Sequence, residues 1–148
     1  MLDCELVGCD LANVVARGAA MRRVELRTAR LTGLAWTEGE LQDVAFRDCR
    51  ADLASFADTR LLRVVFEGCV LREADLQGAS LQSVRFQDCD LSGADLTGAH
   101  MTRCELRGCV LDGLKGVASL RGAAMPWPDV VGAAGTLAAA LGIAVIED

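Results

Sequence analysis

The sequence predicts an all-β solenoid in which the chain turns a corner about every five residues and completes a coil about every twenty. Three observations lead to this fold class: an apolar residue at every fifth position, a series of small residues two positions before it, and like residues that recur at intervals of twenty. Internal repeats of this kind indicate that each unit packs on its neighbours rather than in one thick core.

The five-residue apolar series runs without a break from Leu6 to Leu111. Although 52% of the residues are hydrophobic, an unbroken series of this length does not arise by chance. A helix repeats at 3.6 residues and a flat strand at 2, so neither keeps these positions on one side of the chain. The series consists of Leu6, Leu11, Ala16, Met21, Leu26, Leu31, Trp36, Leu41, Phe46, Ala51, Phe56, Leu61, Phe66, Leu71, Leu76, Leu81, Phe86, Leu91, Leu96, Met101, Leu106 and Leu111.

A second series lies two residues before the first and consists mostly of small residues. It contains every cysteine of the chain: Cys4, Cys9, Cys49, Cys69, Cys89, Cys104 and Cys109. Free cysteine commonly serves as a small buried hydrophobe, and each of these has a small or apolar counterpart in the same series. We therefore expect all seven thiols to be reduced and buried, rather than to form a redox or metal array.

Like residues also recur at intervals of twenty. Phe46, Phe66 and Phe86 form one such column, and Val24, Val44, Val64 and Val84 form another. These columns are expected if four five-residue sides make one coil and successive coils stack at the β-sheet spacing of about 4.8 Å. Five to six coils would then form a rod about 25 to 30 Å long.

Several five-residue units share a motif of a small residue, Asp or Asn, Leu or Phe, a polar residue and often Gly. Ala74-Asp75-Leu76-Gln77-Gly78 and Ala94-Asp95-Leu96-Thr97-Gly98 match it fully. Over about residues 4 to 125 the sequence thereby resembles the pentapeptide-repeat family, and in particular its topoisomerase-binding, fluoroquinolone-resistance type. The resemblance implies a right-handed quadrilateral β-helix, which we assign to residues 1–125.

Two departures from the pattern are local. Between about residues 34 and 59 the series contain the oversized Trp36 and the irregular Leu34, Gly39 and Thr59, so these coils are expected to pack least evenly. After Leu111 the apolar spacing resumes one residue early, which predicts a distorted last coil.

Residues 126–148 form a separate segment that we predict to be a helix over 128–141 and a short strand over 143–146. Pro128 suits a first helical turn and Gly142 suits the position after a helix. The resemblance implies a two-fold dimer built by this segment, and intramolecular capping of the last coil is the alternative. The candidate dimer residues are Trp127, Val131, Leu137, Leu141, Ile143 and Val145.

Composition narrows the classes of function. The net charge of −6 argues against direct binding of nucleic acid, because a phosphate-binding surface needs an excess of Lys and Arg. No signal peptide and no long apolar run are present, so a cytoplasmic protein without membrane contact is expected. His100 is the single histidine and no cysteine pair has metal-ligand spacing, so no cofactor or metal is expected. A smooth rod without insertions offers no concave site, which argues against an enzyme.

Charge is unequal between two sides of the predicted rod. The side of Trp36, Phe56, Leu76 and Leu96 carries the candidate acidic face, consisting of Glu38, Asp58, Asp75 and Asp95. The side of Met21, Leu41, Leu61, Leu81 and Met101 carries Arg22, Arg23, Arg60, Arg63 and Arg103. Asp75 and Asp95 fit a catalytic pair or a recognition stripe, but we expect them to stabilise the corners by accepting backbone amide hydrogens.

Two functions remain open from the sequence. In the first, the chain is a non-enzymatic rod that mimics duplex DNA and binds a type II topoisomerase, DNA gyrase or topoisomerase IV. In the second, it is a generic scaffold or interaction module with an unknown protein partner and no DNA mimicry. The first follows from the resemblance and the net acidity, and the two oppositely charged sides favour the second.

Overall fold

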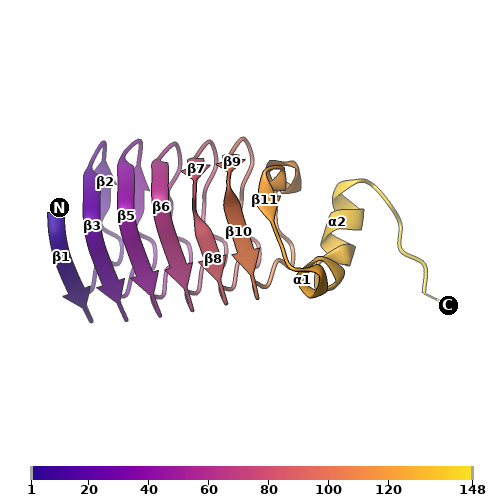
Figure 1. Ribbon diagram of the computed structural model, residues 1–148, viewed down its shortest axis with the longest axis horizontal. Helices are drawn as coiled ribbons and strands as arrows, with labels where there is room; N and C mark the ends of the chain where they lie inside the picture. Colours follow the sequence, from indigo (N-terminus) through magenta and orange to yellow (C-terminus); the bar gives the residue numbers. More distant parts are fainter. Residues whose placement is uncertain (1, 148) are drawn as a thin grey trace.

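The computed structural model describes residues 2–147 and shows a parallel β-solenoid followed by short helices (Figure 1). Nine strands form one parallel sheet. They are β1 (Leu2–Val7), β3 (Ala20–Arg27), β5 (Glu40–Arg47), β6 (Arg60–Glu67), β7 (Ser80–Gln82), β8 (Arg85–Gln87), β9 (His100–Thr102), β10 (Cys104–Arg107) and β11 (Ala123–Ala124). A second parallel sheet pairs β2 (Val15–Arg17) with β4 (Ala35–Thr37).

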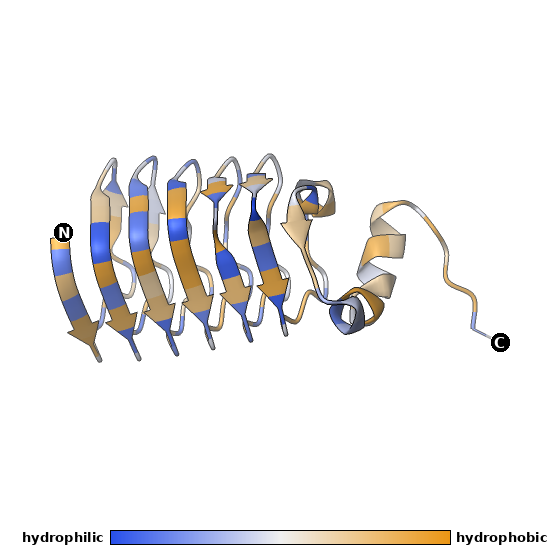
Figure 2. Ribbon diagram, in the orientation of Figure 1, coloured by the Kyte–Doolittle hydropathy of each residue, from blue (hydrophilic) through white to orange (hydrophobic). Residues whose placement is uncertain are grey.

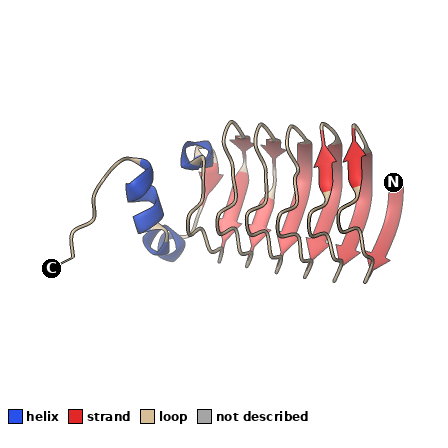
Figure 3. Ribbon diagram, turned by 180° about the vertical axis from the view of Figure 1, so that it is seen from behind, coloured by secondary structure: helices blue, strands red, loops and turns tan. Residues whose placement is uncertain are grey.

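Each coil contains twenty residues, as the register of the strands shows. Leu6 pairs with Leu26, Leu26 with Phe46, and Phe46 with Phe66. Strands at the front of Figure 1 run downward while those at the back run upward in Figure 3, and the coils advance from the N-terminus toward the C-terminus. This sense of rotation makes the solenoid right-handed, and the predicted all-β fold class is confirmed.

Four faces make up the rod, and we number them by the inward apolar residue at the centre of each side. The first face is centred on Leu6 and its counterparts at intervals of twenty, the second on Leu11, the third on Ala16 and the fourth on Met21. Hydrophilic and hydrophobic residues alternate along the strands (Figure 2). One set of side chains therefore points into the core while the other faces solvent.

Stacked aromatic rings fill the interior behind the first face. The ring centroids of Phe46 and Phe66 lie 4.8 Å apart, and those of Phe66 and Phe86 lie 5.0 Å apart, with an interplanar angle of 4° in each pair. Phe56 from the third face meets two of these rings edge to face, at 6.1 and 6.0 Å. The ring spacing equals the coil spacing, so the twenty-residue column predicted from the sequence is a continuous stack.

A left-handed backbone conformation forms every corner. Every fifth residue from Asp3 to Gly113 has a φ between 49° and 72°. Glycine occupies nine of these positions without steric cost, but the other fourteen carry a Cβ that crowds the following carbonyl oxygen. The motif's frequent Gly is therefore explained by the corner itself, one residue after the outward polar position.

The irregular positions between residues 34 and 59 are largely enclosed, and the uneven packing expected there stays a prediction. Leu34 and Ala51 are buried and Thr59 is fully enclosed. Thr59 makes a hydrogen bond like those of the cysteines: its hydroxyl donates to the Trp36 carbonyl at 2.8 Å. In another column the Cys69 thiol donates to the Phe46 carbonyl at 3.3 Å, and both carbonyls lie 23 residues earlier. In the same coils the Trp36 indole N–H is buried without a hydrogen-bond partner.

The last coil is shortened by one residue, as the sequence predicts. Cys104 pairs with Ala123, nineteen residues later instead of twenty, after a 3-10 helix over Val117–Leu120. Gly116 makes this possible because its φ is 71° and a Cβ there would overlap the backbone nitrogen of Thr97.

The C-terminal segment differs from the prediction in two ways. Instead of one helix over 128–141, α1 (Trp127–Gly132) and α2 (Ala134–Ala140) meet at a break at Ala133. Ala133 is buried against the solenoid, so the chain bends to cover the last coil rather than continue straight. The predicted strand over 143–146 is absent, because no strand edge lies beside these residues (Figure 1). Neither helix has the length and apolarity that crossing a bilayer requires.

Truncation of the central ring of the stack tests the core. Phe66→Ala should lower the free energy of unfolding by about 3 to 5 kcal/mol, because Phe66 packs between two rings and is 1% exposed. Phe66→Leu should cost clearly less, since it keeps most of the volume. Denaturant melts measure both, and a loss under about 1 kcal/mol for the alanine variant would show that the ring does not stack inside.

Two serines of one coil test the corner conformation. Ser83 has a φ of 55°, whereas Ser80 lies in β7 with ordinary strand geometry. Ser83→Gly should raise the free energy of unfolding by about 0.5 to 1 kcal/mol, since it relieves the left-handed strain. Ser80→Gly should lower it by about 0.5 to 1 kcal/mol. Equal effects of the two changes in urea melts would contradict a strained corner.

Candidate functional site

Two stacked aspartates lie at the centre of the third face. Asp75 pairs with Asp95 across neighbouring coils, and Asp95 pairs with Lys115 in the next. The Asp75 carboxylate accepts the Gln77 amide hydrogen at 2.9 Å, and the Asp95 carboxylate accepts that of Thr97 at 2.9 Å. Hydrogen bonds from Thr97 and the nearby Lys115 ammonium hold the pKa of Asp95 below its usual value. These two hydrogen bonds confirm the expected corner-stabilising role.

The other two predicted residues of the acidic face lie at corners of the third face. Asp58 projects beside Gly78 of the next coil, where the missing Cβ leaves room for its carboxylate. Glu38 is ion-paired with the Arg17 guanidinium, which lowers the pKa of Glu38. Asp58, Asp75 and Asp95 form no ion pair with any residue in the range 2–147. The structure therefore groups three carboxylates that form no ion pair, although Asp95 lies next to Lys115, and it pairs Glu38 with Arg17.

The sequence interpretation missed one carboxylate that adjoins this face. Glu73 lies at the corner between the second and third faces, two residues before Asp75. It also has no ion-pair partner within the described chain. Glu73 was not assigned to the acidic face because the charges were counted by side, although the five-residue register already placed Glu73 at a corner. We call Asp58, Glu73, Asp75 and Asp95 the acidic patch.

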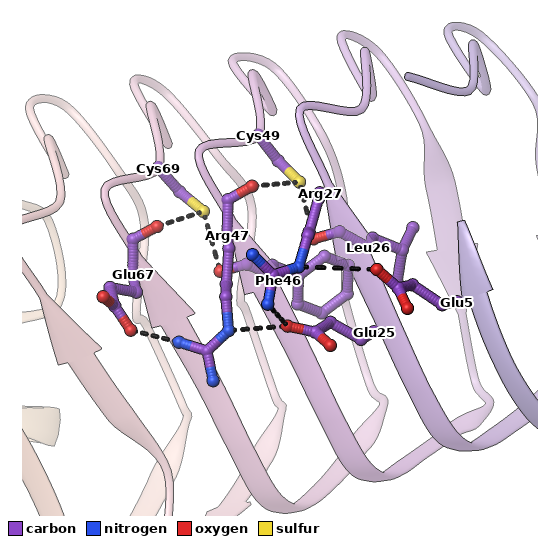
Figure 4. A network of polar contacts seen from close by, with 9 residues as sticks. All are labelled: Glu5, Glu25, Leu26, Arg27, Phe46, Arg47, Cys49, Glu67 and Cys69. Carbon is purple, nitrogen blue, oxygen red and sulfur yellow. Dashed lines mark hydrogen bonds and ion pairs between the residues drawn. The ribbon is translucent and has the colours of Figure 1, made fainter. Parts of the chain in front are cut away.

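Ion pairs neutralise most of the charge near the N-terminus. On the first face, Arg27 and Arg47 both bind Glu25, each at 2.8 Å, and Arg47 also binds Glu67 (Figure 4). Arg27 further approaches Glu5 at 3.6 Å. Exposed pairs stabilise by less than about 1 kcal/mol each, but they cancel charge over the face that they cover.

The predicted basic side is also largely neutralised. Arg23 binds Asp3, Arg63 binds Asp43 at 2.6 Å, and Arg22 approaches Glu40 at 3.5 Å. Arg60 and Arg103 form no ion pair with a described residue. Ion pairs are thus concentrated toward the N-terminal end of the rod, whereas the acidic patch lies on and beside the third face between Asp58 and Asp95.

The cysteines line the core as free thiols. Cys49, Cys69, Cys89 and Cys104 are buried, and burial raises the pKa of the Cys104 thiol. The expectation that all seven are buried is wrong for Cys4, Cys9 and Cys109, which are half-buried because they lie in the first and last coils, where one neighbouring coil is missing. No cluster of three potential metal ligands occurs among residues 2–147. His100 lies exposed on β9, away from them.

The hollows of the surface are open depressions between side chains. One of about 480 Å³ on the second face is lined by Arg50, Asp52, Leu53, Arg72 and Glu73, among others. Its charged groups include Arg50 and Asp52, which pair with each other at 3.7 Å. Ser92 also lines this hollow, and its hydroxyl donates to the Asp90 carboxylate at 2.6 Å.

An apolar surface remains on the C-terminal segment. Five of the six candidate dimer residues are exposed: Trp127 (75%), Val131 (56%), Leu141 (78%), Ile143 (56%) and Val145 (69%). Leu137 instead packs partly buried against the solenoid core. Part of the segment is therefore a cap, as the Thr136 hydroxyl that donates to the Leu111 carbonyl at 3.3 Å also indicates.

Comparisons with protein families find the same five-residue repeat in this chain. Residues 40–115 match the model of a pentapeptide repeat region, and residues 3–33 match that of pentapeptide repeats in eight copies. No match was found among curated proteins.

Solved structures with a similar fold include HetL, a pentapeptide repeat protein involved in heterocyst differentiation regulation from the cyanobacterium Nostoc sp. strain PCC 7120. It is 26% identical with a TM-score of 0.50, over 86% of this chain and 49% of HetL, so the chain spans about half the length of HetL. Full-length QnrB1, a plasmid-mediated fluoroquinolone resistance protein, is 18% identical with a TM-score of 0.42, over 83% of this chain and 70% of QnrB1. With a family model that covers half of its residues and a five-residue register that forms every coil, the chain belongs to the pentapeptide-repeat family.

Proposed function

We propose that this chain is a non-enzymatic protein-interaction rod whose partner binds the acidic patch. The observation that carries the proposal is a group of unpaired carboxylates on and beside one face: those of Asp58, Glu73, Asp75 and Asp95 form no ion pair in the described chain, whereas many carboxylates of the N-terminal coils do. A rigid face with fixed carboxylates favours a partner with a basic surface.

The finer proposal is that this partner is a type II topoisomerase, DNA gyrase or topoisomerase IV, which the patch engages in place of duplex DNA. The net charge of −6 and the stacking of Asp75 on Asp95 support it. The rival proposal is a scaffold with another protein partner and no DNA mimicry. It is favoured by the many ion pairs of the N-terminal coils, since a duplex mimic needs unpaired negative charge along a longer surface.

Charge removal that keeps the corner intact tests the patch. Asp75→Asn with Asp95→Asn retains a side-chain oxygen that accepts the amide of Gln77 or Thr97, but removes both charges. In gyrase supercoiling assays with and without a quinolone, the unaltered chain should inhibit or protect at micromolar concentration, and this variant should do so at least ten-fold less.

The matched control is Asp10→Asn with Asp90→Asn, because these carboxylates accept the amides of Ala12 and Ser92 in the same way on the second face. It should behave like the unaltered chain. If the unaltered chain neither inhibits, protects nor binds gyrase or topoisomerase IV, the DNA-mimic proposal fails and the scaffold remains. If both double variants act alike on whichever partner binds, the acidic patch is not the binding surface.

We also propose that the chain forms a two-fold homodimer through its C-terminal segment. The exposed apolar side chains of Trp127, Val131, Leu141, Ile143 and Val145 support it, since a helix this short needs an apolar partner surface. Residues 143–146, which lack a strand partner here, would gain one across a two-fold axis. Leu137 is omitted because it packs inside its own subunit.

Light scattering on the intact chain tests the dimer. At tens of micromolar the mass should be about twice 15.7 kDa. Leu141→Glu with Ile143→Glu should give monomers that keep the far-UV β signal, because neither side chain packs in the core. A mass near 15.7 kDa for the unaltered chain would end the dimer proposal and leave α1 and α2 as a cap alone.

A further inference from the structure

A hollow of about 580 Å³ lies on the fourth face, between β9 and the 3-10 helix of the last coil. It forms where the shortened last coil has this helix in place of the strand that the regular repeat would supply. β7 pairs with a strand on each side, whereas β9 pairs with β7 alone among the described strands. The edge of β9 that faces the last coil is therefore without a strand partner.

Two backbone N–H groups beside this edge also lack the partners that the repeat gives them elsewhere. In the preceding coil, Gly78 and Ser83 donate their N–H groups to carbonyls of the next coil at 3.0 and 2.9 Å. Gly98 and Arg103 hold the same corner positions one coil later, and neither donates to a backbone carbonyl of residues 2–147. Because Gly98 lines the hollow, its N–H is a donor that a ligand there can reach.

A later corner of the same coil shows what such a donor binds. The Gly108 N–H, at the corner between the first and second faces, donates to the Asp129 carboxylate at 2.7 Å. An anionic oxygen thus takes the place of the carbonyl that a further regular coil would supply, and hydrogen bonds to ionised acceptors are stronger than neutral ones. No carboxylate of residues 2–147 lines the hollow, so Gly98 has no such acceptor.

The polar side chains around the hollow are hydrogen-bond donors. They are His100 and Thr102 of β9, Ser119 of the 3-10 helix and Arg121 directly after this helix. None of the four side chains forms a hydrogen bond or ion pair within the part of the chain that the structure describes. Hydroxyls elsewhere do so, since Thr32 donates to the Asp52 carboxylate at 2.9 Å. The donors of the hollow are therefore available to a ligand.

Positive charge is unopposed on this part of the fourth face. From Thr59 onward the sides that form the face contain no Asp or Glu, namely residues 59–62, 79–82, 99–102 and 117–121. Arg60 and Arg121 lie on these sides, and Arg103 lies at the corner after β9. None of the three arginines forms an ion pair with a described residue. Unpaired cations beside a free backbone amide favour the binding of an anion.

We propose that this hollow is a binding site for a phosphate group. The Arg121 guanidinium would pair with its charge, while the Ser119 hydroxyl and the Gly98 N–H would donate to its oxygens. His100 and Thr102 would donate from the opposite side, and a neutral imidazole also carries one N–H. A phosphate monoester has three acceptor oxygens and a charge of about −1.5 to −2 at pH 7, so it satisfies this number of donors better than a carboxylate does. The hollow and the acidic patch lie on different faces, so failure of either proposal leaves the other intact.

Titration of the intact protein with inorganic phosphate in a buffer of low chloride content tests the site. The backbone amide signals of Gly98 and Ser119 should shift saturably at millimolar phosphate in heteronuclear NMR spectra. The amide signal of Ser92 on the second face should stay in place, because its N–H already donates to Asp90. Acetate at the same ionic strength should bind about ten-fold more weakly, since it has fewer acceptor oxygens and less charge.

Two peptides identify the source of the phosphate group. One is a capped glycine–phosphoserine–glycine peptide, and the other is the same peptide with serine. If the phosphopeptide binds more tightly than inorganic phosphate, the site recognises a phosphorylated side chain of a protein partner. If inorganic phosphate binds more tightly, the site recognises the free anion. The serine peptide should not bind in either case.

Three variants locate the contact. Arg121→Gln removes the charge in the hollow, and His100→Glu adds a charge of the opposite sign. Each should weaken phosphate binding about ten-fold and keep the melting temperature, because neither side chain has a partner in the described structure. Arg60→Gln is the matched control: this arginine is also unpaired and lies on the same face, two coils before His100. It should leave the affinity unchanged.

The proposal is wrong if no saturable shift appears at tens of millimolar phosphate, or if acetate binds as tightly as phosphate. It is also wrong if Arg60→Gln weakens binding as much as Arg121→Gln does, because the face then attracts an adventitious ion only. Unchanged phosphate affinity in a folded His100→Glu variant would likewise exclude the hollow as the binding site.

Discussion

The left-handed corner at every fifth residue is the constraint on which the rest of this structure depends. It fixes the length of each side, and with it the direction in which the backbone groups between corners point. From Asp3 to Gly113 no corner is skipped. Because the sides have equal length, the N–H and C=O groups of one coil face those of the next. The backbone hydrogen bonds between neighbouring coils, which measure 2.7 to 3.1 Å, show this. Sheet formation here is therefore a consequence of corner geometry rather than of strand propensity.

Equal coils also place like residues on top of each other, and this gives each column its own chemistry. Flat rings tolerate such stacking at sheet spacing, and thiols donate to carbonyls of the preceding coil, as Cys69 and Cys89 do at 3.3 and 3.2 Å. Identical charges one coil apart repel each other. The column of Asp3, Arg23, Asp43 and Arg63 avoids this repulsion by alternation, whereas Asp75 lies on Asp95, Glu5 on Glu25 and Arg30 on Arg50. Backbone hydrogen bonds to the carboxylates of Asp75 and Asp95 offset the repulsion between these two.

The regular spacing of the coils explains what could be predicted from the sequence. Core columns, corners and the nineteen-residue last coil depend on spacing alone, and spacing is visible in the chain. The role of Thr59 was not visible, since its hydroxyl acts as a cysteine thiol does only once the carbonyl 23 residues earlier is in place. Pairing of Arg22 with Glu40 and of Arg17 with Glu38 depends on diagonal reach between coils, so a count of charges by side overstated the basic side. The segment after Pro126 has no period, and its break at Ala133 follows from packing on the solenoid rather than from helix signals.

A repeat of this kind contains no signal that ends it, because every coil is a template for the next. The C-terminal end is specified by residues that break the repeat: Gly116 allows the 3-10 helix, one residue is lost from the last coil, and the Asp129 carboxylate accepts the Gly108 amide hydrogen at 2.7 Å. Each of these contacts occupies a group that would otherwise bind a further coil. The first coil keeps the repeat intact up to Asp3 and has no such device among the described residues. Within the described chain, the solenoid therefore changes both its spacing and its backbone conformation only after Gly113, where the helices begin.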